Sequence, residues 1–196
     1  MTIGVLALQG DFREHIAALA KLGENAVEIR TVEQLEQVAA LIIPGGESTT
    51  ISLLAKSTGL DLAIAERIKS GMAIYGSCAG MILLANEILD GRDDQISFNA
   101  IDITVRRNGF GRQVDSFEAK LKSTLFADLM GVFIRAPKIE KIGTNVEVLA
   151  WVEVQGERTP VMVRSGSALA TCFHPELNDD GVVHKYFVDM VHNQQS

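Results

Sequence analysis

One cysteine stands between two glycines, in the stretch Gly76-Ser77-Cys78-Ala79-Gly80, with apolar runs on both sides. A G-x-C-x-G pattern between a strand and a helix predicts a sharp turn that lifts the central side chain clear of the sheet. The free N–H groups of the following helix would stabilise a thiolate, and the Ala79 amide would be placed to donate to an oxyanion. We therefore interpret Cys78 as a nucleophile. The alternative is a buried small residue in a tight turn.

A histidine near the end of the chain can supply the base that a thiol nucleophile needs. His174 ends an apolar run and is followed by Pro175 and Glu176. Proline favours an extended conformation in the residue before it. In an extended segment, residues two apart point the same way, so Glu176 can orient the imidazole. Cysteine, histidine and carboxylate together predict a catalytic triad, with a solvent-facing turn as the alternative.

The other histidines and the second cysteine are expected to have no catalytic role. We interpret His15, His184 and His192 as surface residues. Cys172 lies inside an expected strand and is interpreted as a buried structural thiol, the rival nucleophile to Cys78. The sequence has no C-x-x-C or H-x-x-H spacing, so we expect no metal and no cofactor. Two cysteines favour a cytoplasmic protein with reduced thiols, although a disulfide stays open.

The segment 44–48, Pro-Gly-Gly-Glu-Ser, follows the third apolar run and is a candidate for binding. Glycines let a backbone N–H approach a ligand closely, so Gly46 is a candidate second oxyanion donor. A strand-to-helix turn capped by Ser48 or Thr49 is the alternative, and it is compatible with the first interpretation.

Three arginines at the ends of expected strands are further candidates for binding. Arg106 and Arg107 precede the turn signal Asn108-Gly109, and Arg135 ends the run V-F-I-R. A guanidinium in such a place can clamp a carboxylate through two hydrogen bonds. A solvated arginine is the default alternative for each, and the choice between Arg106 and Arg107 stays open.

The elements that must position these residues follow from hydrophobic patterning. Apolar runs at 3–8, 26–30, 39–43 and 72–75 alternate with amphipathic segments at 11–22, 31–38, 48–56 and 60–69. This alternation predicts an open, mostly parallel, flavodoxin-like α/β sheet flanked by helices, in a single domain spanning residues 1–196. Short apolar runs after residue 101 predict antiparallel strands in the C-terminal half, and a last helix is expected at 183–191. Sites in such sheets lie beyond the carboxyl ends of the strands, where Gly46, Cys78 and His174 stand.

Composition excludes several classes of partner. The net charge of −7 argues against binding to nucleic acid or to an anionic membrane surface. No run of 18 apolar residues predicts a transmembrane helix. The first residues are apolar over a short run without a basic segment before it, so we expect a first strand and no signal peptide.

Taken together, the motifs resemble the triad, or class I, glutamine amidotransferases, which carry G-x-C-x-G at the elbow and H-x-E near the end. Six stretches carry the resemblance: GVLALQGDFREH, LIIPGGESTT, GSCAGMILLA, RNGFGRQVDSFEA, GVFIRAP and FHPEL. They run in order from residue 4 to residue 177. Within that family they are most similar to the glutaminase subunits of pyridoxal 5'-phosphate synthases.

The resemblance implies a function and a set of residues. The chain would hydrolyse L-glutamine to L-glutamate and ammonia through a thioester on Cys78, and ammonia would pass to a separate synthase subunit in a hetero-oligomer that makes pyridoxal 5'-phosphate. Glutamine-binding positions carry over to Gly46, Glu47, Ser48, Arg107, Ile134 and Arg135. We further expect the synthase surface to select the productive orientation of Gly45-Gly46, with Gln9 and the first helix near the partner.

Three alternatives remain. A glutaminase subunit of another synthase, such as imidazole glycerol phosphate synthase, would have a similar length and the same triad. A non-catalytic, redox-sensing thiol module would not need the oriented base that FHPE predicts. An α/β-hydrolase with a cysteine nucleophile usually places its acid before its histidine, whereas Glu176 follows His174.

Overall fold

A nine-stranded sheet runs through the molecule in the computed structural model, which describes residues 1–110, 116–154 and 156–194. From edge to edge its strands are β2 (Asn25–Ile29), β1 (Thr2–Leu6), β3 (Ala40–Ile43), β4 (Ala73–Ser77), β12 (Ala168–Thr171), β11 (Glu157–Ser165), β10 (Glu147–Val154), β7 (Ser116–Ser123) and β8 (Leu129–Ile134). The first five are parallel to one another, and the others pair antiparallel. This arrangement confirms the predicted α/β sheet with antiparallel strands in the C-terminal half.

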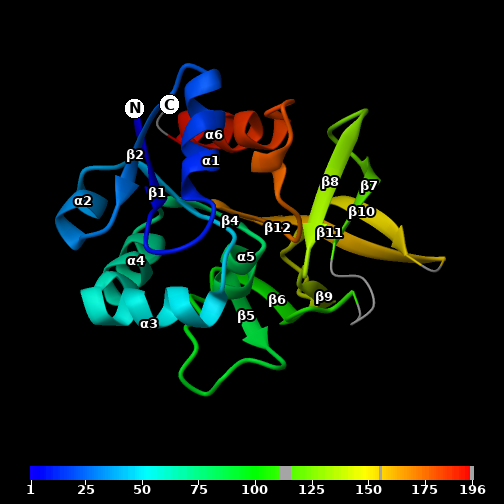
Figure 1. The fold of residues 1–196 in the computed structure, drawn as a ribbon, viewed down its shortest axis with the longest axis horizontal. Coiled ribbons are helices and arrows are strands. Elements are labelled where there is room, and N and C mark those ends of the chain that lie inside the picture. Colours follow the sequence, from blue (N-terminus) through cyan, green and yellow to red (C-terminus); the bar gives the residue numbers. More distant parts are fainter. Residues whose placement is uncertain (111–115, 155, 195–196) are drawn as a thin grey trace.

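Helices cover both faces of the parallel part (Figure 1). The helices α1 (Phe12–Lys21) and α6 (Val182–Gln194) lie together on one face, whereas α3 (Ser48–Thr58), α4 (Leu60–Lys69) and α5 (Ala79–Leu84) lie on the other, and the short α2 (Val32–Glu36) lies near the β2 edge. Strands β3 and β4 are buried along their whole length, as a sheet covered on both faces requires. Thr31, which begins the amphipathic segment 31–38 and is a preferred capping residue, caps α2 in a capping box with Gln34.

Three strands were not expected from the sequence: β7, β5 (Ala85–Ile88) and β9 (Lys138–Ile142). Strand β7 alternates exposed and half-buried residues and carries lysine and glutamate, which lower strand propensity. A second sheet joins β5, β6 (Ile101–Arg106) and β9, and each of these pairings includes a register shift. The strands of this second sheet are short or irregular and give little periodicity for a prediction, whereas the alternation in β7 was an available signal. Residues 111–115, part of the stretch RNGFGRQVDSFEA, lie outside the described residues.

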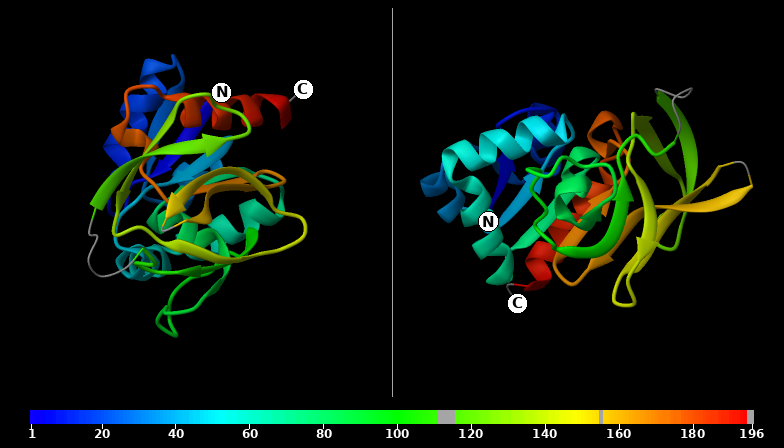
Figure 2. Two further views of the ribbon diagram at one scale, coloured as in Figure 1. Left: turned by 90° about the vertical axis from the view of Figure 1, so that its right-hand side faces the viewer. Right: turned by 90° about the horizontal axis from the view of Figure 1, so that it is seen from below.

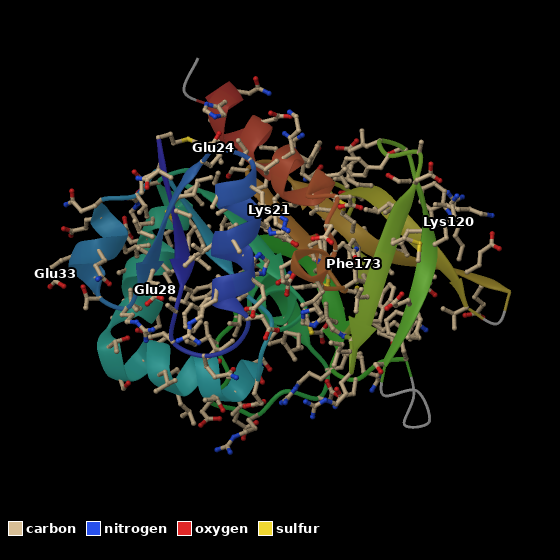
Figure 3. The ribbon with its side chains drawn as sticks, turned by 45° about the horizontal axis from the view of Figure 1, so that its top comes forward. Lys21, Glu24, Glu28, Glu33, Lys120 and Phe173 are labelled. Atoms are coloured by element: carbon tan, nitrogen blue, oxygen red, sulfur yellow. The ribbon has the colours of Figure 1, made fainter. Side chains whose placement is uncertain are left out.

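The antiparallel strands form one end of the molecule, beside the helix-covered parallel part (Figure 2). Charged side chains such as Lys21, Glu33 and Lys120 project outward, whereas Phe173 lies inside (Figure 3). The Phe173 ring centroid lies 5.8 Å from that of Phe133 in β8. The core is therefore continuous across both parts, and it fixes the segment that leads into His174. No helix within the described residues is long and apolar enough to cross a membrane.

Candidate active site

The turn between β4 and α5 holds Cys78 in an unusual backbone conformation, with φ 48° and ψ −102°. The turn needs glycine on both sides of the cysteine. A Cβ on Gly76 would lie 2.5 Å from the carbonyl carbon of Gly80, and a Cβ on Gly80 would lie 2.2 Å from the carbonyl oxygen of Ile43. The sharp turn predicted from G-x-C-x-G is present, and the strained conformation is typical of a nucleophile elbow.

Strand pairing brings the histidine segment to the cysteine. Strand β12 lies next to β4 and runs parallel to it, with Thr171 paired to Ser77. The N–H of Cys78 donates to the Thr171 carbonyl at 2.8 Å, and the N–H of His174 donates to the Val132 carbonyl at 2.9 Å. The carboxyl ends of the two strands therefore meet, as the sequence predicts, although they are far apart along the chain.

 The intervening residues 78–170, between the paired Ser77 and Thr171, include α5, the smaller sheet and the strands β7, β8, β10 and β11 of the large sheet.

His174 is oriented by a carboxylate, through a geometry that differs from the one expected. Pro175–Leu177 form a short 3-10 helix, η1, in place of the predicted extended segment, because proline suits the first position of a helical turn. Even so, Nδ1 of His174 lies 2.7 Å from Oε1 of Glu176. Oδ2 of Asp11 lies 3.6 Å from the same nitrogen. Asp11 stands just before α1, where its residue type predicts a helix cap, but it makes no side-chain hydrogen bond as a cap, so that prediction is wrong.

Opposing effects set the charges of this pair. Burial lowers the pKa of His174, but hydrogen bonds to Cys78 and Glu176 and the charges of both groups raise it to about 10 overall. Burial raises the pKa of Glu176, whereas the nearby His15 and the hydrogen bond to His174 lower it, and the net direction is downward.

Asp11, His174 and Glu176 bring three potential metal ligands within 4.8 Å of one another. The short Glu176–His174 contact suits an oriented imidazolium better than a metal site, since both of its atoms already pair with each other.

A cleft of about 400 Å³ opens over the cysteine. Its lining includes almost all of the predicted site residues: Gly46, Glu47, Ser48, Cys78, Ala79, Arg107, Ile134, Arg135 and His174. Glu176 is not part of the lining and lies behind the imidazole, where it is 8% exposed. Ile134 also supplies the carbonyl that lies 3.9 Å from the sulfur of Cys78. Predicted residues from five separate stretches therefore surround one space.

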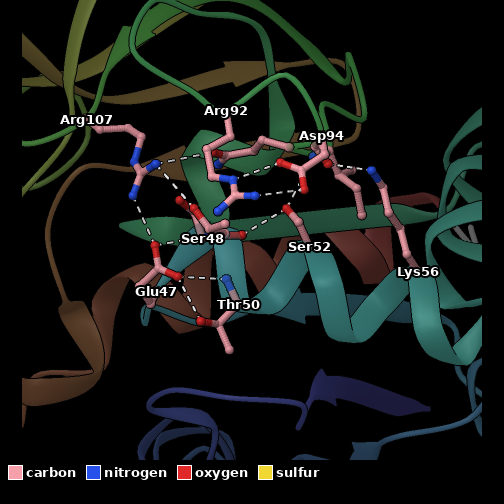
Figure 4. A network of polar contacts seen from close by, with 11 residues as sticks. Glu47, Ser48, Thr50, Ser52, Lys56, Arg92, Asp94 and Arg107 are labelled. Atoms are coloured by element: carbon pink, nitrogen blue, oxygen red, sulfur yellow. Dashed lines mark hydrogen bonds and ion pairs between the residues drawn. The ribbon is translucent and has the colours of Figure 1, made fainter.

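Glu47 and Arg107 form an ion pair at one end of this cleft (Figure 4). Nη2 of Arg107 lies 3.0 Å from Oε1 of Glu47. The Glu47 carboxylate accepts from the N–H groups of Thr49 and Thr50 and so caps α3, a role that the sequence analysis gave to Ser48 or Thr49. Burial raises the pKa of Glu47, but these hydrogen bonds outweigh it and lower the pKa. Arg106 pairs with Glu140 instead, at 3.0 Å, so Arg107 is the arginine that faces the cleft.

The glycine loop before α3 is braced by the segment that follows β1. Oε1 of Gln9 accepts from the N–H of Glu47 at 2.7 Å. The N–H of Asp11 donates to the carbonyl of Gly45 at 3.2 Å. A Cβ on Gly45 would lie 2.4 Å from Cε1 of His174, so only glycine lets the loop lie against the imidazole. Gln9 and Asp11 also line the cleft: Gln9 follows β1 at the carboxyl edge of the sheet, where a site was expected, whereas no motif in the sequence points to Asp11.

Two histidines expected on the surface are buried. His15 and His184 are each 0% exposed, and Nδ1 of His15 lies 2.9 Å from Nε2 of His184. The position of His15 between Phe12 and Leu19 on one helical stripe was the available signal for its burial. His192 is half exposed, as expected, and lies 3.3 Å from Glu24. Cys172 is fully buried, and burial raises its pKa, in agreement with a structural thiol.

Comparisons with known proteins agree over almost the whole chain. The model of the SNO glutamine amidotransferase family matches residues 5–193. A protein of Mycobacteroides abscessus named pyridoxal 5'-phosphate synthase subunit PdxT is 57% identical over 190 residues, covering 96% of each chain. A protein of Nocardioides sp. with the same name is 54% identical over 193 residues, covering 97% of this chain and 96% of the relative.

Solved structures extend this likeness to the fold. A crystal structure described as a glutamine amidotransferase has a TM-score of 0.89 and 47% identity, covering 97% of this chain and 98% of that chain. PurLQS from Thermotoga maritima has a TM-score of 0.71 at 17% identity, covering 100% of this chain and 98% of that chain, which supports the fold alone. From the match of the family model and the identity of these relatives, the chain belongs to the SNO glutamine amidotransferase family.

Proposed function

We propose that the chain hydrolyses L-glutamine to L-glutamate and ammonia as the glutaminase subunit of a pyridoxal 5'-phosphate synthase. The observation that carries this proposal is the meeting of β4 and β12, which puts Cys78 and the Glu176-paired His174 in one cleft. Family membership supports the glutamine chemistry. The names of the relatives support the synthase, since those at 57% and 54% identity are both called synthase subunits.

In the proposed mechanism, the Cys78 thiolate attacks the side-chain carboxamide carbon of glutamine. His174 has a pKa of about 10, so it is an imidazolium near neutral pH and can protonate the departing ammonia. Loss of ammonia leaves a glutamyl thioester and a neutral imidazole. The imidazole then takes a proton from water, the hydroxide attacks the thioester, and glutamate leaves as the thiolate–imidazolium pair re-forms.

The developing oxyanion needs donors beside the sulfur. We assign this role to the N–H groups of Ala79, the first residue of α5, and Gly46 in the loop before α3. Each donor would lower the activation barrier by roughly 3 kcal/mol. We further propose that the synthase subunit selects the orientation of Gly45-Gly46 in which Gly46 donates, because glycine peptides rotate at low cost. Gln9 holds the same loop and is a route by which the partner could act on it.

The Glu47–Arg107 pair suits the other end of the substrate. A free α-amino acid is a zwitterion, and it offers a carboxylate to Arg107 and an ammonium to Glu47. The ion pair already balances these charges, so glutamine can enter without leaving either group unpaired. We assign Ser48, Ile134 and Arg135 to the same binding site, because they line the same cleft.

We propose that residues 1–196 act as one amidotransferase domain that passes ammonia to the synthase in a hetero-oligomer. The continuous core and the family match over residues 5–193 support a single unit. A cytoplasmic location is supported by the need to keep the Cys78 thiol reduced.

The test is glutamine-dependent ammonia release by this chain, with and without the synthase subunit. Cys78→Ala is expected to abolish release and leave the fold intact. Cys172→Ala is the matched control, because it removes a buried thiol outside the cleft and is expected to retain turnover. His174→Asn should also lose turnover. Turnover like that of the unchanged chain in Cys78→Ala would contradict the proposal.

A further inference from the structure

The proposed mechanism leaves two buried histidines without a role, and they lie directly behind the triad. His15 from α1 bonds His184 from α6 through Nδ1 and Nε2, at 2.9 Å. Its other nitrogen, Nε2, lies 2.9 Å from Oγ of Ser77 and 3.4 Å from Oε2 of Glu176. Within the described part of the chain, this Oε2 makes no hydrogen bond. Oε1 of Glu176 pairs with His174, and Oε2 faces the other way, toward Nε2 of His15.

Hydrogen bonding selects one arrangement of protons on the two rings. Nδ1 of His184 is buried and has no hydrogen-bond partner among the described residues, so a proton there would be an orphaned donor. With its proton on Nε2, His184 donates to Nδ1 of His15, and the proton of His15 must then lie on Nε2. The opposite arrangement would turn a lone pair of His15 toward the Glu176 carboxylate. Both rings therefore carry their proton on Nε2, and His15 presents an N–H to Ser77 and Glu176.

The surroundings favour neutral rings. Burial lowers the pKa of His15, the adjacent Glu176 raises it, and the net direction is downward; His174, Asp11 and Glu14 face it with smaller effects. For His184, burial lowers the pKa to about 3, with His15 and Glu176 as the titratable neighbours. The Tyr75 ring lies edge-on to both histidines, with centroids 6.0 Å and 6.2 Å away, and its hydroxyl pairs with Thr171.

We propose that His15 is a positioning residue for the glutaminase reaction: a neutral imidazole, fixed in its tautomer by His184, that holds the outer oxygen of Glu176 so that the inner oxygen stays on His174. The inference rests on the proposed function. A neutral donor suits this role because it leaves the negative charge of Glu176 for the imidazolium of His174. A cationic His15 would compete with His174 for that charge.

Two substitutions separate the two nitrogens of His15. The amide nitrogen of glutamine reaches about as far as Nε2, whereas that of asparagine reaches about as far as Nδ1. His15→Gln therefore keeps a donor for Glu176, and His15→Asn keeps only a partner for His184. His192→Gln, at a half-exposed histidine outside the cleft, is the matched control.

The readout is ammonia release with the synthase subunit present, as kcat and KM across a pH series. We expect His15→Asn to lower kcat roughly 10-fold, because it removes the 3.4 Å contact between an N–H group and the charged carboxylate, with little change in KM. Its acid limb should move to higher pH, because Glu176 loses a donor that favours its charged form. His15→Gln should stay within about threefold of the unchanged chain, like the control. Equal losses in both variants, or an acid limb that does not move, would overturn the proposal.

A second measurement does not depend on activity. Nitrogen NMR of the unchanged chain is expected to show neutral His15 and His184 with the proton on Nε2 at neutral pH. A proton on Nδ1 of His15, or an imidazolium at either residue, would overturn the proposal. If the unchanged chain released no ammonia with its synthase, the proposed function would fail while these tautomers could still be found. Failure of the two ideas is therefore distinguishable.

Discussion

Replacing Glu176 by glutamine tests how much the carboxylate contributes to the reactive ion pair. The pKa of His174 is raised from 6.5 to about 10. At about 1.4 kcal/mol per pH unit, these 3.5 units correspond to about 5 kcal/mol, which Cys78 and Glu176 supply together against the effect of burial. Glu176→Gln removes one of the two groups that raise this pKa, so the alkaline limb of the kcat/KM profile should move to lower pH. The Glu176 carboxylate also orients the imidazole through the 2.7 Å contact, so kcat/KM should fall roughly 10- to 100-fold, the effect of one hydrogen bond to a charged group.

The assay is ammonia release with the synthase subunit, measured between about pH 6 and pH 9. The rate at which iodoacetamide alkylates Cys78 reports the thiolate independently and should fall as well. A glutamine side chain is nearly isosteric, so circular dichroism and the unfolding midpoint should change little. A loss of less than about threefold in kcat/KM, in a folded variant, would refute the reasoning that Glu176 stabilises the imidazolium.

Other predictions concern the elbow, the arginines and the second buried histidine. Gly80→Ala should cost about 1 to 3 kcal/mol in urea unfolding, because its Cβ would lie 2.2 Å from the Ile43 carbonyl; an unchanged midpoint would contradict this. Arg107→Ala should raise KM for glutamine roughly 10- to 100-fold, whereas Arg106→Ala should not. Equal effects of the two substitutions would contradict the assignment of Arg107 as the arginine that binds glutamine. The pKa of His184 is lowered to about 3, so the unfolded chain binds the extra proton below pH 6.5 and stability falls there. His184→Gln should remove about 2 kcal/mol of the stability difference between pH 7 and pH 5; an unchanged difference would contradict it.

Much of the fold and of the site follows from local sequence signals. The buried parallel strands are continuous apolar runs, so their order along the chain and the position of Cys78 at a strand end were predictable. Glycine is required on both sides of Cys78 because a Cβ at either position would clash with the backbone. Pairing of β12 with β4 could be expected only in outline, because it joins residues far apart in the sequence.

What could not be predicted depends on contacts between distant elements. The pairing of His15 with His184 requires α1 and α6 to pack together on one face of the sheet, and neither helix alone shows it. Asp11 looks like a helix cap in the sequence, but the nearby imidazole of His174 draws its carboxylate away. Glu47 caps α3 because Arg107, from beyond β6, holds it at the helix start. In each case a contact between elements far apart in the sequence sets the position of the side chain.

The central claim is that Cys78 forms a covalent glutamyl thioester. The most direct measurement is rapid-quench mass spectrometry of the chain mixed with glutamine and the synthase subunit, followed by peptide mapping. The account predicts one glutamyl group on the peptide that contains Cys78, and none on the peptide that contains Cys172. Ammonia release with no adduct at Cys78, or with the adduct at another residue, would contradict it.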